Sequence, residues 1–340
     1  MRVYLMLLLL LATLQLKAAD LQYSNNDTAS REQIPFNQGW SYYDAYNFSQ
    51  GISKEKVTLP HTWNADVPLK GIADYKRSTG IYENTITFKE EWKSKRIFLF
   101  FEGANSVATL FINDRYVSEH KGGYTAFCVE ISSFLKAGRN RVKVLVSNAL
   151  RLDVLPITGD FNVYGGLHRP VSLLVTSPNC ITPLDYASSG VYISPKKVSE
   201  EEAELVITTK LSFSQKLDGF LHTSILDANG KLVAEQTSPV NDTTLHQNFN
   251  LKKPHLWNGK VDPYLYKVKT ELLQDKQVVD RVVQPLGLRY YHVDPDKGFF
   301  LNGKYLDLHG VGRHADIYGK GSALSKEDYD RDMDLIMELG

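Results

Sequence analysis

Residues 96–146 read RIFLFFEGANSVATLFINDRYVSEHKGGYTAFCVEISSFLKAGRNRVKVLV, and their pattern is typical of a sheet protein. Residues 96–101 and 108–112 are short apolar runs, Asn113-Asp114 forms a polar turn after them, and residues 141–146 alternate between polar and apolar side chains. A period of two places successive side chains on opposite faces of a strand. No helical pattern of length interrupts this stretch. The chain is therefore predicted to be mainly β, with an antiparallel sandwich here.

A second all-β unit follows a linker. Residues 177–183 hold two prolines and no periodic pattern, which is typical of a connection. Residues 186–283 again contain short strands, and Asn229-Gly230 predicts a hairpin with a two-residue loop because both positions tolerate a positive φ. The spacing of these strands fits a small immunoglobulin-like sandwich. No residue cluster in it suggests chemistry, so we interpret this unit as a spacer.

The sequence pattern changes near residue 295 from one typical of strands alone to one that predicts both strand and helix. Residues 299–306 predict a tight hairpin, and residues 304–311 predict a strand. Ser325 and Asp328 have the spacing of a capping box, in which each side chain satisfies a backbone N–H group of the other residue. The apolar residues that follow recur on one face of a helix. A strand therefore leads into a helix for the first time in this chain.

Composition excludes some classes of protein. Lys+Arg and Asp+Glu each number 39, so the net charge is zero, which argues against a nucleic-acid partner because such binding needs a basic surplus. The two cysteines, Cys128 and Cys180, are too few for a disulfide framework. They are either one disulfide in an oxidising compartment or two thiols.

The N-terminal segment resembles a secretory signal. Met1-Arg2 carries positive charge, and residues 3–14 are almost wholly apolar but shorter than the roughly 20 residues that a transmembrane helix needs. Small residues follow at Ala18-Ala19. We predict a signal peptide over residues 1–19, and therefore a secreted or periplasmic protein with no membrane span after cleavage. An uncleaved anchor is the alternative.

Seven short motifs, spread in order along the chain, point to one enzyme family. They are LPHTWN (59–64), GIY (80–82), FEGANS (101–106), DFNVYGGLHRPV (160–171), LGLR (286–289), FLNGK (300–304) and HGVGRH (309–314). In this order and at these separations they resemble the N-terminal part of a glycoside hydrolase family 2 enzyme, and most of all its β-galactosidases.

The resemblance implies three domains after the signal peptide. The first is a jelly-roll sugar-binding sandwich over residues 20–179, and the second is the immunoglobulin-like sandwich over residues 180–288. Residues 289–340 would then be the first βα unit of a (β/α)8 TIM barrel that is incomplete in this chain. A complete barrel needs about 250 residues.

The resemblance also implies residues that contact the sugar. Asp160, six residues before Gly166, matches a family aspartate that contacts the sugar and helps to hold a metal ion. Asn64 lies in the Trp-Asn segment that approaches the site. His314 belongs to an Asn-Arg-His motif in the family, where its imidazole donates to sugar hydroxyls, but Gly312 replaces the asparagine here. For each of these three, a purely structural role is the alternative.

As to function, the resemblance implies a retaining exo-β-glycosidase that hydrolyses terminal β-galactosides. Such hydrolysis needs two carboxyl groups that flank the scissile bond. The first of the family's two glutamates lies in an Asn-Glu pair, which residues 289–340 lack. We therefore assign no catalytic residue within this chain and expect the 340-residue chain alone to be inactive, with both glutamates beyond it.

Two alternatives stay open. The chain is either a non-catalytic, carbohydrate-binding β-sandwich protein, or part of a β-glucuronidase or β-mannosidase of the same family. β-Glucuronidases share the Gly-x-His-Arg pattern found at residues 166–169. In each case the partner is a β-galactoside or a related oligosaccharide. No cofactor is assigned, although a Mg²⁺ or Na⁺ ion in the full-length enzyme is left open, and the sequence does not indicate an oligomeric state.

Overall fold

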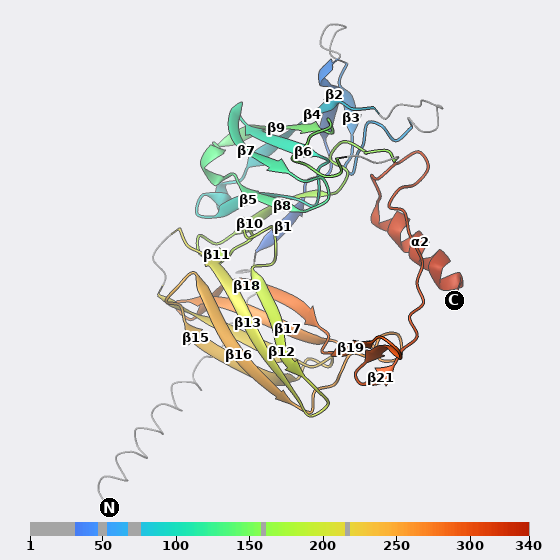
Figure 1. Cartoon of the computed structure of the whole chain (residues 1–340). Helices are drawn as coiled ribbons and strands as arrows, with labels where there is room; N and C mark the ends of the chain where they lie inside the picture. Colours follow the sequence, from blue (N-terminus) through green and yellow to red (C-terminus); the bar gives the residue numbers. More distant parts are fainter. Residues whose placement is uncertain (1–30, 47–52, 67–75, 158–160, 215–217, 340) are drawn as a thin grey trace, which may run out of the picture. The chain divides into compact units, whose positions relative to one another are not determined.

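The computed structural model describes residues 31–46, 53–66, 76–157, 161–214 and 218–339 (Figure 1). The chain divides into two compact units. The first unit comprises residues 32–176, 183–188 and 307–340. The second unit comprises residues 1–31, 177–182 and 189–306. The predicted signal peptide lies outside the described residues.

The first unit contains two antiparallel sheets. One has six strands in the order β3-β2-β4-β9-β6-β7, and the other has four in the order β1-β10-β5-β8. The strands are β1 (Glu32–Pro35), β2 (Trp40–Asp44), β3 (Glu55–Val57), β4 (Thr79–Phe88), β5 (Arg96–Phe101), β6 (Val107–Ile112), β7 (Arg115–Lys121), β8 (Phe127–Glu130), β9 (Gly138–Ser147) and β10 (Val171–Thr176), with short 3-10 helices η4 (Glu90–Trp92) and η5 (Ser132–Phe134). The antiparallel sandwich predicted from the alternating pattern is confirmed.

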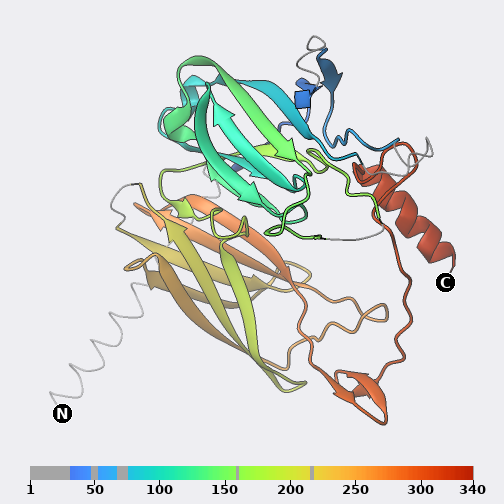
Figure 2. The same ribbon diagram turned by 45° about the horizontal axis from the view of Figure 1, so that its top comes forward.

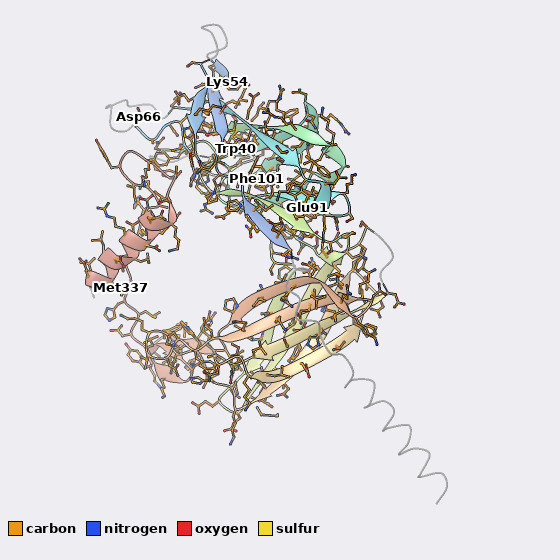
Figure 3. All side chains as sticks on the ribbon, turned by 180° about the vertical axis from the view of Figure 1, so that it is seen from behind. Trp40, Lys54, Asp66, Glu91, Phe101 and Met337 are labelled. Carbon is orange, nitrogen blue, oxygen red and sulfur yellow. The ribbon has the colours of Figure 1, made fainter. Side chains whose placement is uncertain are left out.

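The core of the first unit lies between these sheets. Trp40 and Tyr82 come from the six-stranded sheet, and Leu99 and Phe101 come from the four-stranded one, and all four are fully buried. Trp40 and Phe101 are labelled in Figure 3. Each large apolar side chain removed from water contributes about 1.5–3 kcal/mol. The Phe101 ring also stacks on Phe127 at a centroid distance of 4.5 Å.

The second unit is another antiparallel sandwich, and Figure 2 shows its strands in two layers. In one layer β13 pairs with β11, β12 and β16, and the other layer has the order β15-β14-β17-β18. The strands are β11 (Cys180–Ile181), β12 (Val191–Val198), β13 (Glu202–Ser212), β14 (Gly219–Leu226), β15 (Leu232–Pro239), β16 (Thr244–Lys252), β17 (Tyr266–Gln274) and β18 (Gln277–Leu286).

The hairpin predicted around Asn229-Gly230 is confirmed, but its loop is longer than two residues. Leu226 pairs with Leu232, so five residues connect β14 to β15. The carboxylate of Asp227 accepts hydrogen bonds from the N–H groups of Asn229 (2.9 Å) and Lys231 (2.8 Å). This side chain therefore stabilises a wider turn, in which only Gly230 among the central residues takes a positive φ.

Residues 291–305 form a small three-stranded sheet in the order β19-β20-β21. Its strands are β19 (Tyr291–Asp294), β20 (Gly298–Leu301) and β21 (Lys304–Tyr305). The predicted tight hairpin is confirmed, because Asn302 (φ 49°) and Gly303 (φ 76°) form the turn between β20 and β21.

The strand predicted over residues 304–311 is wrong beyond Tyr305. A barrel strand needs a parallel neighbour on each side to satisfy its backbone groups. Every strand pairing among the described residues is antiparallel, and β21 pairs there only with β20. The described part of the chain therefore contains no TIM barrel, and residues 306–316 follow β21 without regular structure.

Helix α2 (Lys326–Glu338) begins at the predicted capping box. The Ser325 hydroxyl accepts from the Asp328 N–H, and the Asp328 carboxylate accepts from the Ser325 N–H at 2.8 Å. The Lys320 ammonium also pairs with Asp328 at 2.7 Å. No residue of the helix is buried, and Met337, labelled in Figure 3, is 76% exposed. The helix is therefore stabilised by its cap and ion pairs, with its apolar face open.

Two further features follow from the described residues. No helix among them is long and apolar enough to cross a membrane. Cys128 is half-buried and Cys180 is buried, and the structure has no disulfide between them. The thiol alternative of the sequence analysis therefore describes this structure.

Candidate functional site

The first unit contains a buried amide that joins two loops distant in sequence. Asn64 is fully buried. Its Nδ2 donates to the Val163 carbonyl and to Asn162 Oδ1, both at 3.1 Å, and its Oδ1 accepts from the Gly165 N–H at 3.0 Å. The Thr62 hydroxyl lies 2.6 Å from the Gly165 carbonyl. We call these residues the Asn64 clamp. Asn64 positions the 161–168 loop, and its direct contact with a sugar stays a prediction.

An aromatic wall lies beside the Asn64 clamp. Trp63 stacks on Tyr42 with 11° between the ring planes. A Cβ on Gly165 would lie 2.1 Å from Trp63, so only glycine allows the loop to approach this ring. Gly166 has φ +125°, and a Cβ there would lie 2.5 Å from the Tyr82 hydroxyl. The two glycines are needed for this close packing.

Two histidines of this region, His61 and His168, contact other groups of the protein. His61 Nδ1 lies 2.8 Å from the Tyr82 hydroxyl, and burial lowers the pKa of His61 to about 4. His168 Nε2 lies 2.8 Å from the Gly123 carbonyl, and burial lowers its pKa too. Both imidazoles are therefore neutral at pH 7. They are poorly suited to proton transfer at that pH, because an efficient acid or base has a pKa near the working pH.

The segment of residues 316–324, which we call the docking segment, contacts the 161–168 loop. The Tyr164 hydroxyl donates to the Asp316 carboxylate at 3.1 Å. A Cβ on Gly321 would lie 2.5 Å from the Tyr164 ring and 3.2 Å from Thr62, so the backbone of this segment lies directly on the ring. Leu324 at its end is 4% exposed. The Asn64 clamp therefore supports Tyr164, and Tyr164 supports the docking segment.

His314 precedes the docking segment by two residues and is exposed. Its neighbour Arg313 donates from Nε to Asp332 of α2 at 2.8 Å, and its guanidinium lies 4.9 Å from the Tyr329 ring centre. The strand predicted over residues 304–311 ends at Tyr305, so His314 does not directly follow a strand. Its contact with sugar stays a prediction.

Asp160, the proposed sugar and metal ligand, lies outside the described residues. Within the described ranges no group of three His, Cys, Asp or Glu side chains is placed to hold a metal ion.

Sequence reasoning missed two residues of this arrangement. Tyr164 stood inside a recognised motif, but nothing in the pattern indicated that its hydroxyl binds Asp316, 152 positions later. Nothing in the sequence around Gly321, apart from its being a glycine, indicated that its backbone packs on Tyr164. Arg169 of the same motif donates to the Tyr124 carbonyl at 3.1 Å.

Comparison with known families shows the class of this two-sandwich protein. Residues 41–178 match the model described as the sugar-binding domain of glycosyl hydrolases family 2. Residues 188–289 match a second model of the same family, and the two matches together cover more than half of the chain. The first unit therefore includes a sugar-binding domain of a glycosidase. The chain belongs to glycoside hydrolase family 2.

Several similar proteins come from Bacteroides species. A β-glucuronidase of Bacteroides fragilis is 44% identical over 92% of this chain and 46% of its own length. A β-glucuronidase structure from Bacteroides uniformis is 33% identical in sequence and has a TM-score of 0.84. The match covers 92% of this chain and 39% of the B. uniformis chain. A B. fragilis structure that is provisionally assigned as a β-galactosidase is 38% identical in sequence and has a TM-score of 0.85. The match covers 92% of this chain and 49% of the B. fragilis chain. The chain spans half or less of each.

The Asn64 clamp predicts a large effect of Asn64→Ala. The substitution leaves the Val163 carbonyl and the Gly165 N–H without partners in a buried place, at about 1–3 kcal/mol for each group. We expect the free energy of unfolding of the first unit to fall by about 2–4 kcal/mol. Urea denaturation followed by tryptophan fluorescence measures it.

The control for this experiment is Asn84→Ala, which removes an exposed hydrogen bond to the Gln38 carbonyl in the same unit. It should cost less than about 1 kcal/mol. Equal losses in the two variants would show that Asn64 contributes no more than a surface amide.

The docking segment predicts that Gly321→Ala releases it from Tyr164. The new methyl group would clash with the ring, so we expect faster amide hydrogen exchange in peptides covering residues 316–324. Gly319→Ala is the matched control, because Gly319 has a similar positive φ of 75° but no atom within 4 Å of an added Cβ. Both variants carry the backbone strain of about 1–2 kcal/mol, and only Gly321→Ala adds the clash. Identical exchange in the two variants contradicts the packing described here.

Proposed function

We propose that this chain is the N-terminal, sugar-binding part of a family 2 β-glucuronidase. The observation that carries the proposal is the 44% identity to the B. fragilis β-glucuronidase over 92% of the chain. A β-galactosidase, which the motifs alone favour, is the second candidate. It is supported by the provisionally assigned B. fragilis structure and by a Thermoanaerobacter pseudethanolicus β-galactosidase at 29% identity.

In this proposal the chain binds and positions substrate, while bond cleavage requires groups outside it. Retaining hydrolysis uses one carboxylic acid to protonate the leaving oxygen and one carboxylate to attack the anomeric carbon. We assign both carboxyl groups to the portion of the relatives that this chain does not match. Residues 1–19 would direct the enzyme out of the cytoplasm, where it meets extracellular or periplasmic glycosides.

His314 is the described residue that we assign to substrate binding. It is exposed and lies close in sequence to the docking segment, whose contact with Tyr164 limits its freedom. An exposed imidazole donates a hydrogen bond to a sugar hydroxyl, and the neighbouring Arg313 is tied to Asp332 of α2. We assign Asp160, by the family resemblance, to the same sugar.

The substrate assignment predicts the specificity of the protein made from the complete reading frame. Its kcat/KM on p-nitrophenyl β-glucuronide should exceed that on p-nitrophenyl β-galactoside by about 100-fold, since a site built for a carboxylate rejects an analogue that lacks it. The opposite preference would establish the β-galactosidase candidate instead. The 340-residue chain, assayed alongside at equal concentration, should give no turnover of either glycoside, and turnover by it would refute the assignment of both carboxyl groups to another part.

The role of His314 is tested in the same protein with His314→Ala. Loss of one hydrogen bond to the substrate should lower kcat/KM by about tenfold. His309→Ala is the matched control, because this exposed histidine lies five residues earlier and contacts Asp307 at 3.0 Å. It should leave kcat/KM within about twofold. A His314→Ala enzyme with unchanged kcat/KM would assign this histidine a purely structural role.

A further inference from the structure

Arg313 joins the chain just before the docking segment to helix α2. Its Nε donates to Asp332 Oδ2 at 2.8 Å, its Nη2 donates to the same oxygen, and its guanidinium lies 4.9 Å from the centre of the Tyr329 ring. Tyr329 and Asp332 are three residues apart on α2, so they share one face of the helix. The side chains of Arg313 and Asp332 are 22% and 24% exposed. Two contacts of different kinds therefore hold this guanidinium against the helix.

A second anchor lies two residues after His314. The Asp316 carboxylate accepts from the Tyr164 hydroxyl at 3.1 Å, and Tyr164 belongs to the loop that the Asn64 clamp holds. A backbone turn over residues 317–321 follows, and two hydrogen bonds of 3.0 and 2.9 Å close it. His314 therefore lies between two anchored residues, Arg313 on one side and Asp316 on the other.

The backbone just before Arg313 contains two glycines in open space. Residues 306–312 have no regular structure, and a Cβ added to Gly310 or Gly312 would meet no atom within 4 Å. Glycine loses more conformational freedom on ordering than any other residue. Since packing around these glycines does not hold the backbone, we attribute the position of His314 on this side to Arg313 and its partners on α2.

From this arrangement we infer that Asp332 is a positioning residue for His314. Asp332 fixes the Arg313 side chain, and Arg313 fixes the backbone from which the next side chain, the His314 imidazole, extends. A group that is ordered before binding loses less conformational entropy when substrate binds. The inference rests on the proposed assignment of His314 to substrate binding. It adds a residue of helix α2 that acts through Arg313 without touching the sugar.

Trypsin cleavage after Arg313 measures this hold in the 340-residue chain itself. Trypsin takes the arginine side chain into its own specificity pocket, so cleavage requires Arg313 to leave Asp332 and Tyr329. Asp332→Asn should therefore speed cleavage at this bond by about fivefold. Mass spectrometry of timed digests follows the peptide that ends at Arg313. Cleavage after Lys297, an exposed residue between β19 and β20, is the internal reference.

Asp330→Asn is the matched control for the digestion. Asp330 lies two residues before Asp332 on α2, and its carboxylate pairs with Lys326 of the same helix. The substitution removes the same charge and one ion pair, and it leaves the Arg313 contacts described here in place. Cleavage after Arg313 should stay within about twofold of the rate in the unmodified chain. Equal cleavage rates in the two variants would show that Asp332 does not hold Arg313, which overturns the inference.

Kinetics of the protein made from the complete reading frame test the link to His314. On the preferred p-nitrophenyl glycoside, Asp332→Asn should lower kcat/KM by about fivefold, and Asp332→Glu, which keeps a carboxylate for Arg313, should recover most of this loss. In the His314→Ala background, Asp332→Asn should change kcat/KM by less than about twofold, because the group that it positions is gone. A purely structural role of Asp332 predicts the same loss in both backgrounds, and that result overturns the inference.

The same variants separate this inference from the assignment on which it rests. An unchanged kcat/KM in His314→Ala refutes the substrate role of His314, and the inference falls with it. A loss of kcat/KM in His314→Ala, beside an unchanged kcat/KM in Asp332→Asn, keeps the substrate role of His314 and overturns only its positioning by Asp332.

Discussion

The Asn64 side chain is the constraint on which the candidate site depends. One primary amide joins two loops about 100 residues apart, and its donors and acceptor all have protein partners. Because the amide is fully buried, breaking these bonds would leave orphaned backbone groups rather than hydrated ones. The loop that it holds must also pass against Trp63, which only Gly165 allows. A polar contact and a steric one therefore fix the same backbone from two sides.

The 161–168 loop connects the sugar-binding unit to a later part of the chain. Residues 307–340 belong to the same compact unit as residues 32–176, although the immunoglobulin-like residues separate them in sequence. Among the contacts that join them, Tyr164 binds Asp316 and covers Gly321. Long-range contacts of this kind cost loop-closure entropy, but that cost grows only slowly with loop length. A domain inserted between the two segments is therefore tolerated.

Local features were predictable from the sequence, and features that depend on distant partners were not. Alternating strands, the Asn302-Gly303 turn and the Ser325–Asp328 cap each depend on residues a few positions apart, and the structure has all of them. The loop after Leu226 is longer than predicted because the Asp227 carboxylate competes for the turn. The strand expected beyond Tyr305 is missing because no neighbouring strand pairs with it. The role of Asn64 was hidden for the same reason, since its partners lie a hundred residues away.

The structure also explains why this chain carries little information on the sugar that is cleaved. The His-Arg pattern at residues 168–169, shared with β-glucuronidases, invites assignment to the glucuronate carboxylate. His168 is instead buried against the Gly123 carbonyl, and Arg169 donates to the Tyr124 carbonyl. Both side chains support the backbone of the 122–124 turn, so their presence does not by itself indicate recognition of a carboxylate. Identity to named relatives is therefore a better guide to the substrate than this motif.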